Sequence, residues 1–311
     1  MNINNVCLVL LFALMTSYAV FTFHEINIHD EYPDYYDNVV PYIMSCELDE
    51  IPSRNGETTR SPIKWYMVCL SYHVFGNENV IPALFSILLI PATFQLGSQL
   101  GSSRITGLVS AMVLVSSPMF NRWDTSATYD QIWTFFLVLS MILITHPKVS
   151  PAVYVLSVLA KGLSLLYAPM IFYQYVKNVK DKRLVSILLA MFIISGIIIS
   201  VTGFGGSIEF DGEEFVKGFY IWYFYFGDPL VMGFPVVVLL LISLRKNIKN
   251  YDVVVFWIIG IILTTPLILG FTNQLIHPYR FVPFTIFYGI GIGMIIKFYL
   301  EKKKWLRIES Y

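Results

Sequence analysis

The sequence predicts an all-α protein, a single polytopic bundle of about ten membrane-spanning helices. The first observation is composition, because 56% of the 311 residues are hydrophobic and only 14% are charged, whereas a soluble domain has about 25% charged residues. The second is pattern, because apolar stretches recur along the chain with short polar segments between them. Together these observations exclude disordered, collagen-like and cytosolic globular proteins.

The apolar stretches give the order of the spans. The first covers residues 6–23, and because no Lys or Arg precedes it, we interpret it as an anchor and not as a cleaved signal peptide. The stretch 63–75 is too short to cross a bilayer and contains two basic residues, so it predicts an interfacial helix. The other spans are expected near 80–100, 105–120, 130–145, 149–162, 163–177, 184–202, 229–244, 252–271 and 281–298.

Two polar segments are expected to form loops outside the cytoplasm. The first loop covers residues 24–78 and includes the interfacial helix, and the second covers 203–228. The second loop ends in an aromatic run from Phe219 to Phe226, which fits either an aromatic belt at the membrane surface or a helix that covers the site. The prediction is one integral-membrane domain over residues 1–311, with no separate soluble domain.

The charges are distributed unevenly across the predicted membrane. Net charge is zero, from 21 basic and 21 acidic residues, which excludes the basic excess of a nucleic-acid binder. With the N-terminus in the cytoplasm, fourteen of the 21 Lys and Arg residues fall on the inner side, as the positive-inside rule requires. Seventeen of the 21 acidic residues fall on the outer side. We expect a multi-pass protein of the cell membrane with both termini in the cytoplasm.

Ionisable residues gather at the predicted outer ends of the spans. The first loop opens with five acids within thirteen residues: Glu25, Asp30, Glu31, Asp34 and Asp37. Three more groups lie at or near outer span ends, namely Asp130, Lys161 and Arg280. Each alone fits a solvated loop, a snorkelling side chain or a helix-end charge. All of these residues map to the outer face of the membrane. Because an ionisable residue at membrane depth is costly unless it faces a polar cavity, we interpret them as one shared extracytoplasmic site.

An ordered set of short motifs accompanies these groups. The chain resembles the GT-C polytopic glycosyltransferases that use polyprenyl-phosphate-linked sugars, especially the protein O-mannosyltransferase and aminoarabinose transferase branch. The motifs that carry the resemblance are Asp30-Glu31, Arg60-Ser61-Pro62-Ile63-Lys64-Trp65-Tyr66, Phe75-Gly76-Asn77-Glu78, Ser116-Ser117-Pro118, Asp130, Lys161-Gly162 and His277-Pro278-Tyr279-Arg280-Phe281. No single motif is specific, and their order along the chain carries the resemblance.

The resemblance implies a role for each candidate residue. Transfer from a lipid phosphate needs a base for the acceptor hydroxyl and positive charge for the departing phosphate. Asp30 is expected as the base with Glu31 as its partner, and Asp130 as a second acid that positions the acceptor or the sugar. The expected phosphate ligands are Lys161, Arg280, Arg60 and Lys64. The expected substrate contacts are His29, Tyr129, His277 and Tyr279.

The resemblance also implies partners. The donor would carry mannose or a related hexose or pentose on polyprenyl phosphate, and the acceptor would be a protein, lipid or glycan outside the cytoplasm, with inversion at the anomeric carbon. Membrane lipids are expected partners and nucleic acid is not. No obligatory cofactor is expected, and a divalent cation on Asp30, Glu31 and His29 is the less favoured alternative.

Two questions stay open from the residues alone. A transporter or flippase would also use about ten spans with ionisable residues, although we find no internal repeat and the candidate residues cluster at one face. The chain has three cysteines, and Cys46 and Cys69 could pair if both face an oxidising compartment. The sequence does not decide whether they do.

Overall fold

The computed structural model describes residues 3–26, 46, 62–121, 131–179, 210–225, 233–272 and 281–303. All regular structure in these ranges is helical, which confirms the predicted all-α class. Three of the described helices are long and apolar enough to cross a membrane: α1 (Ile3–His24), α5 (Val80–Gly101) and α16 (Val282–Lys302). These helices support membrane character, whereas the count of about ten spans stays a prediction.

Most of the other helices lie within the predicted apolar stretches, whereas α12 (Gly212–Tyr225) lies within the second predicted loop. α4 (Pro62–Phe75) covers the stretch predicted as an interfacial helix, and its position at the interface stays a prediction. The described set also contains α6 (Arg104–Val115), α7 (Pro118–Asn121), α8 (Gln131–Ile142), η1 (Leu143–Thr145), α9 (Val149–Ala160), η2 (Gly162–Tyr167), α10 (Ala168–Asn178), α12 (Gly212–Tyr225), α14 (Phe234–Ser243) and α15 (Tyr251–Thr272). Several are short: the 12 residues of α9 measure about 18 Å, against about 30 Å for a bilayer core. The predicted span 184–202 lies outside the described residues.

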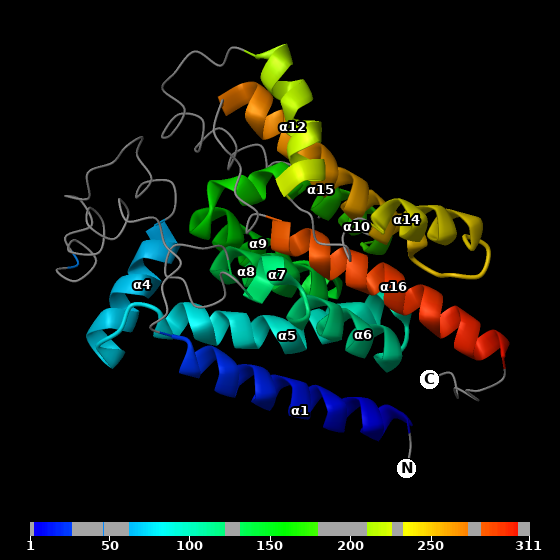
Figure 1. The fold of residues 1–311 in the computed structure, drawn as a ribbon, viewed down its shortest axis with the longest axis horizontal. Coiled ribbons are helices and arrows are strands. Elements are labelled where there is room, and N and C mark those ends of the chain that lie inside the picture. The colour runs from blue at the N-terminus through cyan, green and yellow to red at the C-terminus, as the bar shows by residue number, and fades with distance from the viewer. Residues whose placement is uncertain are drawn as a thin grey trace. The chain divides into compact units, whose positions relative to one another are not determined.

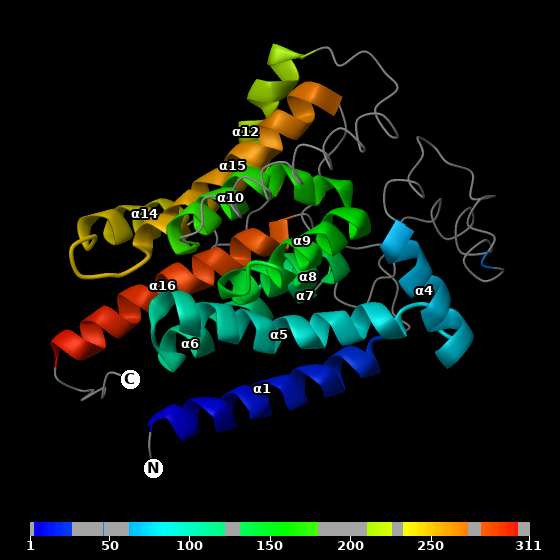
Figure 2. The ribbon, with the colours of Figure 1, turned by 180° about the vertical axis from the view of Figure 1, so that it is seen from behind.

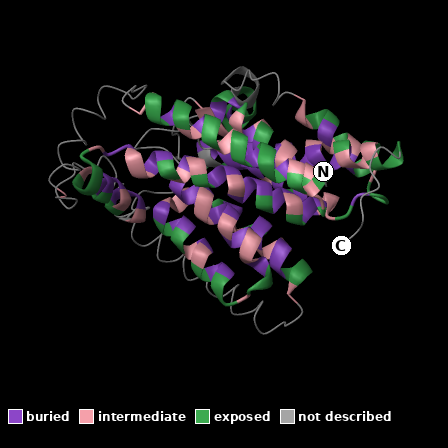
Figure 3. Cartoon of the chain, turned by 90° about the horizontal axis from the view of Figure 1, so that it is seen from below, coloured by how far each residue is buried: buried purple, intermediate pink, exposed green. Residues whose placement is uncertain are grey.

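The chain forms two compact units. Unit 1 contains Met1–Thr16, Ile90–Asn121 and Asp211–Tyr311, and unit 2 contains Ser17–Leu89 and Arg122–Phe210. The boundaries fall inside α1 and α5, so each of these helices contributes to both units. Figure 3 shows buried and exposed residues alternating along the same helices. Each such helix therefore has one face covered by protein and one open face, as expected for apolar helices with lipid around them.

Helix α6 in unit 1 is packed closely through glycines. A Cβ added at Gly97 of α5 would lie 3.0 Å from the Cα of Gly107 on α6. One added at Gly293 of α16 would lie 2.8 Å from the backbone oxygen of Thr106 on α6. Figures 1 and 2 show α16 crossing beside α6. Small residues let helix backbones approach, which is the main source of packing energy between helices in lipid.

Polar contacts join the helix ends of unit 1 that the sequence predicts to be cytoplasmic. Lys297 Nζ of α16 donates to the Gly101 carbonyl at 3.0 Å, and Asn250 Nδ2 donates to the Leu100 carbonyl at 3.1 Å. These carbonyls end α5 and have no partner within the helix, so the two donors cap it. The Arg104 guanidinium donates to the Asn4 carbonyl at 3.2 Å. Helix ends that the sequence predicts to lie on the same side of the membrane are therefore in contact with one another in unit 1.

Helix α12 packs along α15 in unit 1, as Figure 1 shows. Asp211 Oδ1 accepts from the backbone N–H of Glu213 at 2.9 Å and of Glu214 at 3.2 Å, so Asp211 caps α12. The Asp211 N–H donates to the Gly270 carbonyl at 2.8 Å. The second predicted loop thus contains a capped helix that rests on α15.

Unit 2 is built on α8 and α9, which pack against each other, and α4 packs on α9. Its core contains large side chains that are almost fully buried, including Trp65, Trp133, Tyr154 and Tyr167. A disulfide joins Cys46 to Cys69 of α4 with 5.8 Å between the Cα atoms. The bond resolves the pairing that the sequence left open, and it fastens the first loop to α4.

Candidate functional site

Two of the predicted site residues lie in the described part of the chain. They are Lys64 on α4 and Lys161 at the end of α9, and both belong to unit 2. The other predicted residues lie outside the described ranges: His29, Asp30, Glu31, Arg60, Tyr129, Asp130, His277, Tyr279 and Arg280. The predicted grouping of acids with these two lysines therefore stays a prediction.

Lys161 occupies a break between two helical segments. α9 ends at Ala160, and Lys161 takes an extended backbone conformation with φ −156° and ψ 116° before η2 begins at Gly162. The Lys161 N–H donates to the Ser157 carbonyl at 3.0 Å, and its own carbonyl accepts from the Ser164 N–H at 2.9 Å. The cationic side chain is half-buried at the C-terminus of α9, where the helix dipole favours positive charge.

Buried hydroxyl groups hold this break in place. Ser157 Oγ donates to the Trp133 carbonyl of α8 at 2.8 Å and lies 2.7 Å from Ser164 Oγ. Tyr154 Oη donates to the Ser164 carbonyl at 2.7 Å. These bonds tie α8, α9 and η2 together on both sides of Lys161. A polar network that satisfies its own donors fixes one backbone arrangement and so fixes where Lys161 emerges.

Aromatic side chains pack against the same hydroxyl network. The Trp133 ring stacks on the Tyr167 ring with 5.7 Å between centroids and 7° between planes. Trp133 is 1% exposed, yet its Nε1 donates to no acceptor among the described residues, and neither does the buried Thr134 Oγ1. Buried donors are nearly always satisfied in folded proteins. Trp133 and Thr134 are consecutive on α8, and consecutive residues do not share a helix face, so these two donors do not define one ligand site.

Lys64 is the second described cation. It is 6% exposed, and lysine is rarely buried to this extent. Its Nζ lies 4.8 Å from the centroid of the Trp65 ring, within range of a cation–π interaction. Trp65 itself is 2% exposed. α4 packs on α9, the helix that ends at Lys161, so unit 2 carries both lysines on a pair of packed helices.

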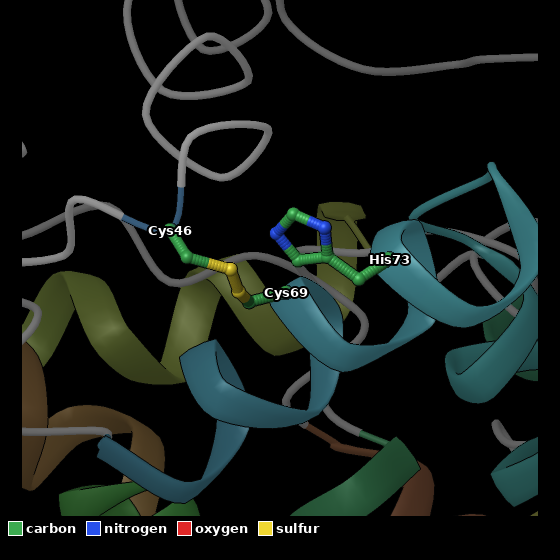
Figure 4. A group of neighbouring side chains, drawn as sticks. All are labelled: Cys46, Cys69 and His73. Atoms are coloured by element: carbon green, nitrogen blue, oxygen red, sulfur yellow. A yellow bond between two sulfur atoms is a disulfide. The ribbon is translucent and has the colours of Figure 1, made fainter.

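Figure 4 shows a further group that the sequence did not predict as a site: Cys69 and His73 of α4 with Cys46 of the first loop. The sulfur atoms and an imidazole nitrogen lie within 4.8 Å of one another. The spacing of Cys69 and His73, four residues apart in an apolar helix, was the available signal, because residues at i and i+4 share a helix face. The possible pairing of Cys46 with Cys69 was considered from the sequence, but the sequence did not place His73 beside them.

No family model, curated protein or solved structure matches this chain.

The hydroxyl network was also not predicted from the sequence, although the sequence contains a periodic pattern that indicates it. Ser150, Ser157 and Ser164 recur every seven residues in an otherwise apolar region. A heptad spacing keeps side chains near one helix face. Ser150 lies at the other end of α9, where its Oγ donates to the Ser140 carbonyl at 2.5 Å and accepts from Tyr175 Oη. The serines thus mark the interhelical contacts of unit 2.

Proposed function

We propose that this protein is a membrane glycosyltransferase that moves a sugar from a polyprenyl-phosphate carrier to an acceptor outside the cytoplasm. The observation that carries the proposal is Lys161, a cation held at a helix break by a buried hydroxyl network. The buried Lys64 on the adjoining helix α4 supports it. Lipid phosphate carries negative charge at the membrane surface, and cations at fixed positions are what its recognition needs.

The proposed reaction is a single displacement at the anomeric carbon. Asp30 takes the proton of the acceptor hydroxyl as the oxygen attacks C1, and the bond from C1 to the phosphate oxygen breaks with its electron pair on the phosphate. Glu31 supports the base, and Asp130 positions the acceptor or the sugar. Lys161 and Lys64, with Arg60 and Arg280, stabilise the phosphate as it gains charge. We propose this chemistry without an obligatory metal.

Two observations support an extracytoplasmic site. Disulfides persist in oxidising compartments, and the Cys46–Cys69 bond spans the segment that contains Lys64. The side chains of Lys297, Asn250 and Arg104 donate to backbone carbonyls at helix ends that the charge rule assigns to the cytoplasm. We therefore propose a multi-pass protein of the cell membrane with both termini in the cytoplasm and the site on the other side.

The proposal is tested by transfer of labelled sugar from polyprenyl-phosphate donors by the purified protein. The Lys161→Met variant is expected to lower the rate by roughly 10²- to 10³-fold, the usual effect of removing one group that stabilises developing charge. Lys148→Met is the matched control, because Lys148 precedes the other end of α9 and is exposed. Asp30→Asn, Glu31→Gln and Asp130→Asn are expected to lower transfer with little change in donor binding.

Two results would contradict the proposal. One is a wild-type protein that transfers no sugar from any polyprenyl-phosphate donor, and the other is a folded Lys161→Met protein that matches Lys148→Met. Circular dichroism shows whether each variant is folded, and it is recorded before the transfer rates are compared.

A transporter or flippase is the second candidate, and one observation favours it. The interruption between α9 and η2 at Lys161 resembles the discontinuous helices that bind substrate in many transporters. The two functions differ in products: a transporter moves its substrate across proteoliposomes unchanged, whereas a transferase consumes the lipid-linked sugar. Movement of intact polyprenyl-phosphate sugar without any transfer would favour the transporter.

A further inference from the structure

We propose that Cys46, Cys69 and His73 form a redox-controlled zinc site, which binds one Zn²⁺ when the cysteines are reduced and none when they are joined as a disulfide. Two thiolates and one imidazole are the ligands that Zn²⁺ selects among protein side chains. The inference concerns a different group from the proposed transferase site and does not depend on it.

The backbone already brings the three ligands together. Cys69 and His73 stand one helical turn apart on α4, so both side chains project from one face. Cys46 reaches the same face from the first loop, with its Cα 5.8 Å from that of Cys69. Figure 4 shows the His73 ring beside the two sulfur atoms.

The spacing of the ligand atoms suits a tetrahedral ion. The three atoms lie within 4.8 Å of one another. Bonds of about 2.3 Å to sulfur and about 2.0 Å to nitrogen place tetrahedral ligand atoms about 3.5–3.8 Å apart. Opening the disulfide lets the sulfur atoms move apart to that distance, so the side chains can accept the ion without rearrangement of α4. Water would fill the fourth position.

Accessibility decides how the site opens. Cys69 is 7% exposed, whereas Cys46 is half-buried and His73 is exposed. A thiolate of a thiol–disulfide oxidoreductase, or of a small thiol, therefore attacks Cys46 Sγ, and Cys69 Sγ leaves with the electron pair of the broken bond. A second thiol of the reductant then attacks the mixed disulfide and releases Cys46. The reductant is oxidised to a disulfide, and the protein gains two thiols.

Zinc binding then replaces one cross-link with another. The two thiols lose their protons to water as the two S–Zn bonds form, and His73 donates its nitrogen lone pair. The first loop stays attached to α4 in both states, through sulfur in one and through the ion in the other. The function of such a site is to keep this attachment when the compartment becomes reducing.

The test uses the full-length protein in detergent, with Co²⁺ as the spectroscopic probe and Zn²⁺ as competitor. After reduction with a phosphine and anaerobic removal of the reductant, Co²⁺ is expected to give sulfur-to-cobalt charge-transfer and tetrahedral d–d bands at one equivalent per chain. Zn²⁺ is expected to remove these bands. The same preparation left oxidised is expected to show none, which makes the wild type its own control and requires no substitution.

Variants then assign the ligands. His73→Ala is expected to weaken Co²⁺ binding at least about tenfold, because loss of even an outer partner of a metal ligand costs roughly 10- to 100-fold. His73 is exposed, so the variant is expected to keep the wild-type circular dichroism spectrum. Cys7→Ser is the matched cysteine control, since Cys7 is buried in α1 and outside the disulfide, and it is expected to bind as the wild type does.

Three results would overturn the inference. They are a reduced wild type without cobalt bands, a folded His73→Ala protein with unchanged affinity, and equal binding by the oxidised and reduced forms. None of these results bears on sugar transfer, so failure of the metal site and failure of the proposed transferase activity are separate outcomes.

Discussion

Replacing Gly293 with alanine is expected to destabilise the contact between α16 and α6. The added Cβ would lie 2.8 Å from the Thr106 carbonyl oxygen and 2.9 Å from the Thr106 Cα, whereas ordinary van der Waals contact begins at 3.4 Å. The shortfall is about half an ångström. Because both Thr106 atoms belong to the backbone, no rotation of a side chain relieves the overlap, and α6 and α16 must move apart.

The expected magnitude follows from two opposing terms. Overpacking of this kind costs about 1–3 kcal/mol, and a gap of half an ångström weakens the remaining dispersion contacts by about a quarter. Alanine in place of glycine returns up to about 1 kcal/mol of helix propensity. The net expectation for Gly293→Ala is a loss of about 1–2 kcal/mol in the free energy of unfolding.

The assay is unfolding by a denaturing detergent in mixed micelles, followed by tryptophan fluorescence. Trp257 of α15 stacks on Phe287 of α16 with 4.4 Å between ring centroids, so it reports on the packing of α16. Gly212→Ala is the matched control, because nothing lies within 4 Å of a Cβ added there and only helix propensity changes. A Gly293→Ala protein as stable as the wild type, or as stable as Gly212→Ala, would refute the close backbone contact.

Two further predictions concern α12. Asp211→Ala removes the cap of this helix and is expected to lower the free energy of unfolding by about 1 kcal/mol. Asp211→Asn keeps an acceptor oxygen and is expected to lower it less. Equal losses of stability in the two variants, measured by thermal unfolding, would exclude capping as the cause. A hydrogen bond and ion pair with Glu214 raise the pKa of Lys217 above its ordinary value of 10.5. The contribution of that pair is therefore present below the ordinary pKa and disappears as the pH rises through the raised one. Because the pair is exposed, Lys217→Met is expected to leave the unfolding midpoint at pH 7 nearly unchanged, and a clear loss of stability at pH 7 would contradict this expectation.

Hydropathy predicted the positions of the helices well, because burial in lipid depends on runs of apolar side chains. The ranges expected near 80–100 and 281–298 correspond to α5 and α16. Hydropathy did not predict where an apolar stretch breaks. The expected span 105–120 is divided after Val115, where the cap residue Ser116 ends α6 and α7 begins at Pro118. A proline is favoured at a helix start, and the residue before it avoids helical geometry.

The sequence predicted less of the candidate site than of the fold. Lys161 was identified from its position at a corner between spans, and the structure places it at a helix break. The hydroxyl groups that hold the break join three elements, and such contacts between distant residues leave only a weak periodic signal. Three cysteines allow more than one pairing, so the Cys46–Cys69 bond had to be seen in the structure. The acidic candidates, which lie outside the described residues, stay a prediction.

The Cys46–Cys69 bond closes the residues between the two cysteines into a covalent ring. The cysteines are 23 residues apart in the sequence. A protease that cuts once between residues 47 and 61 would leave the two fragments joined. The nicked protein would migrate as one band on a denaturing gel without reductant and as two bands after reduction. Digestion of sealed cells or of inverted vesicles, read in this way, would report from which side of the membrane the ring can be reached.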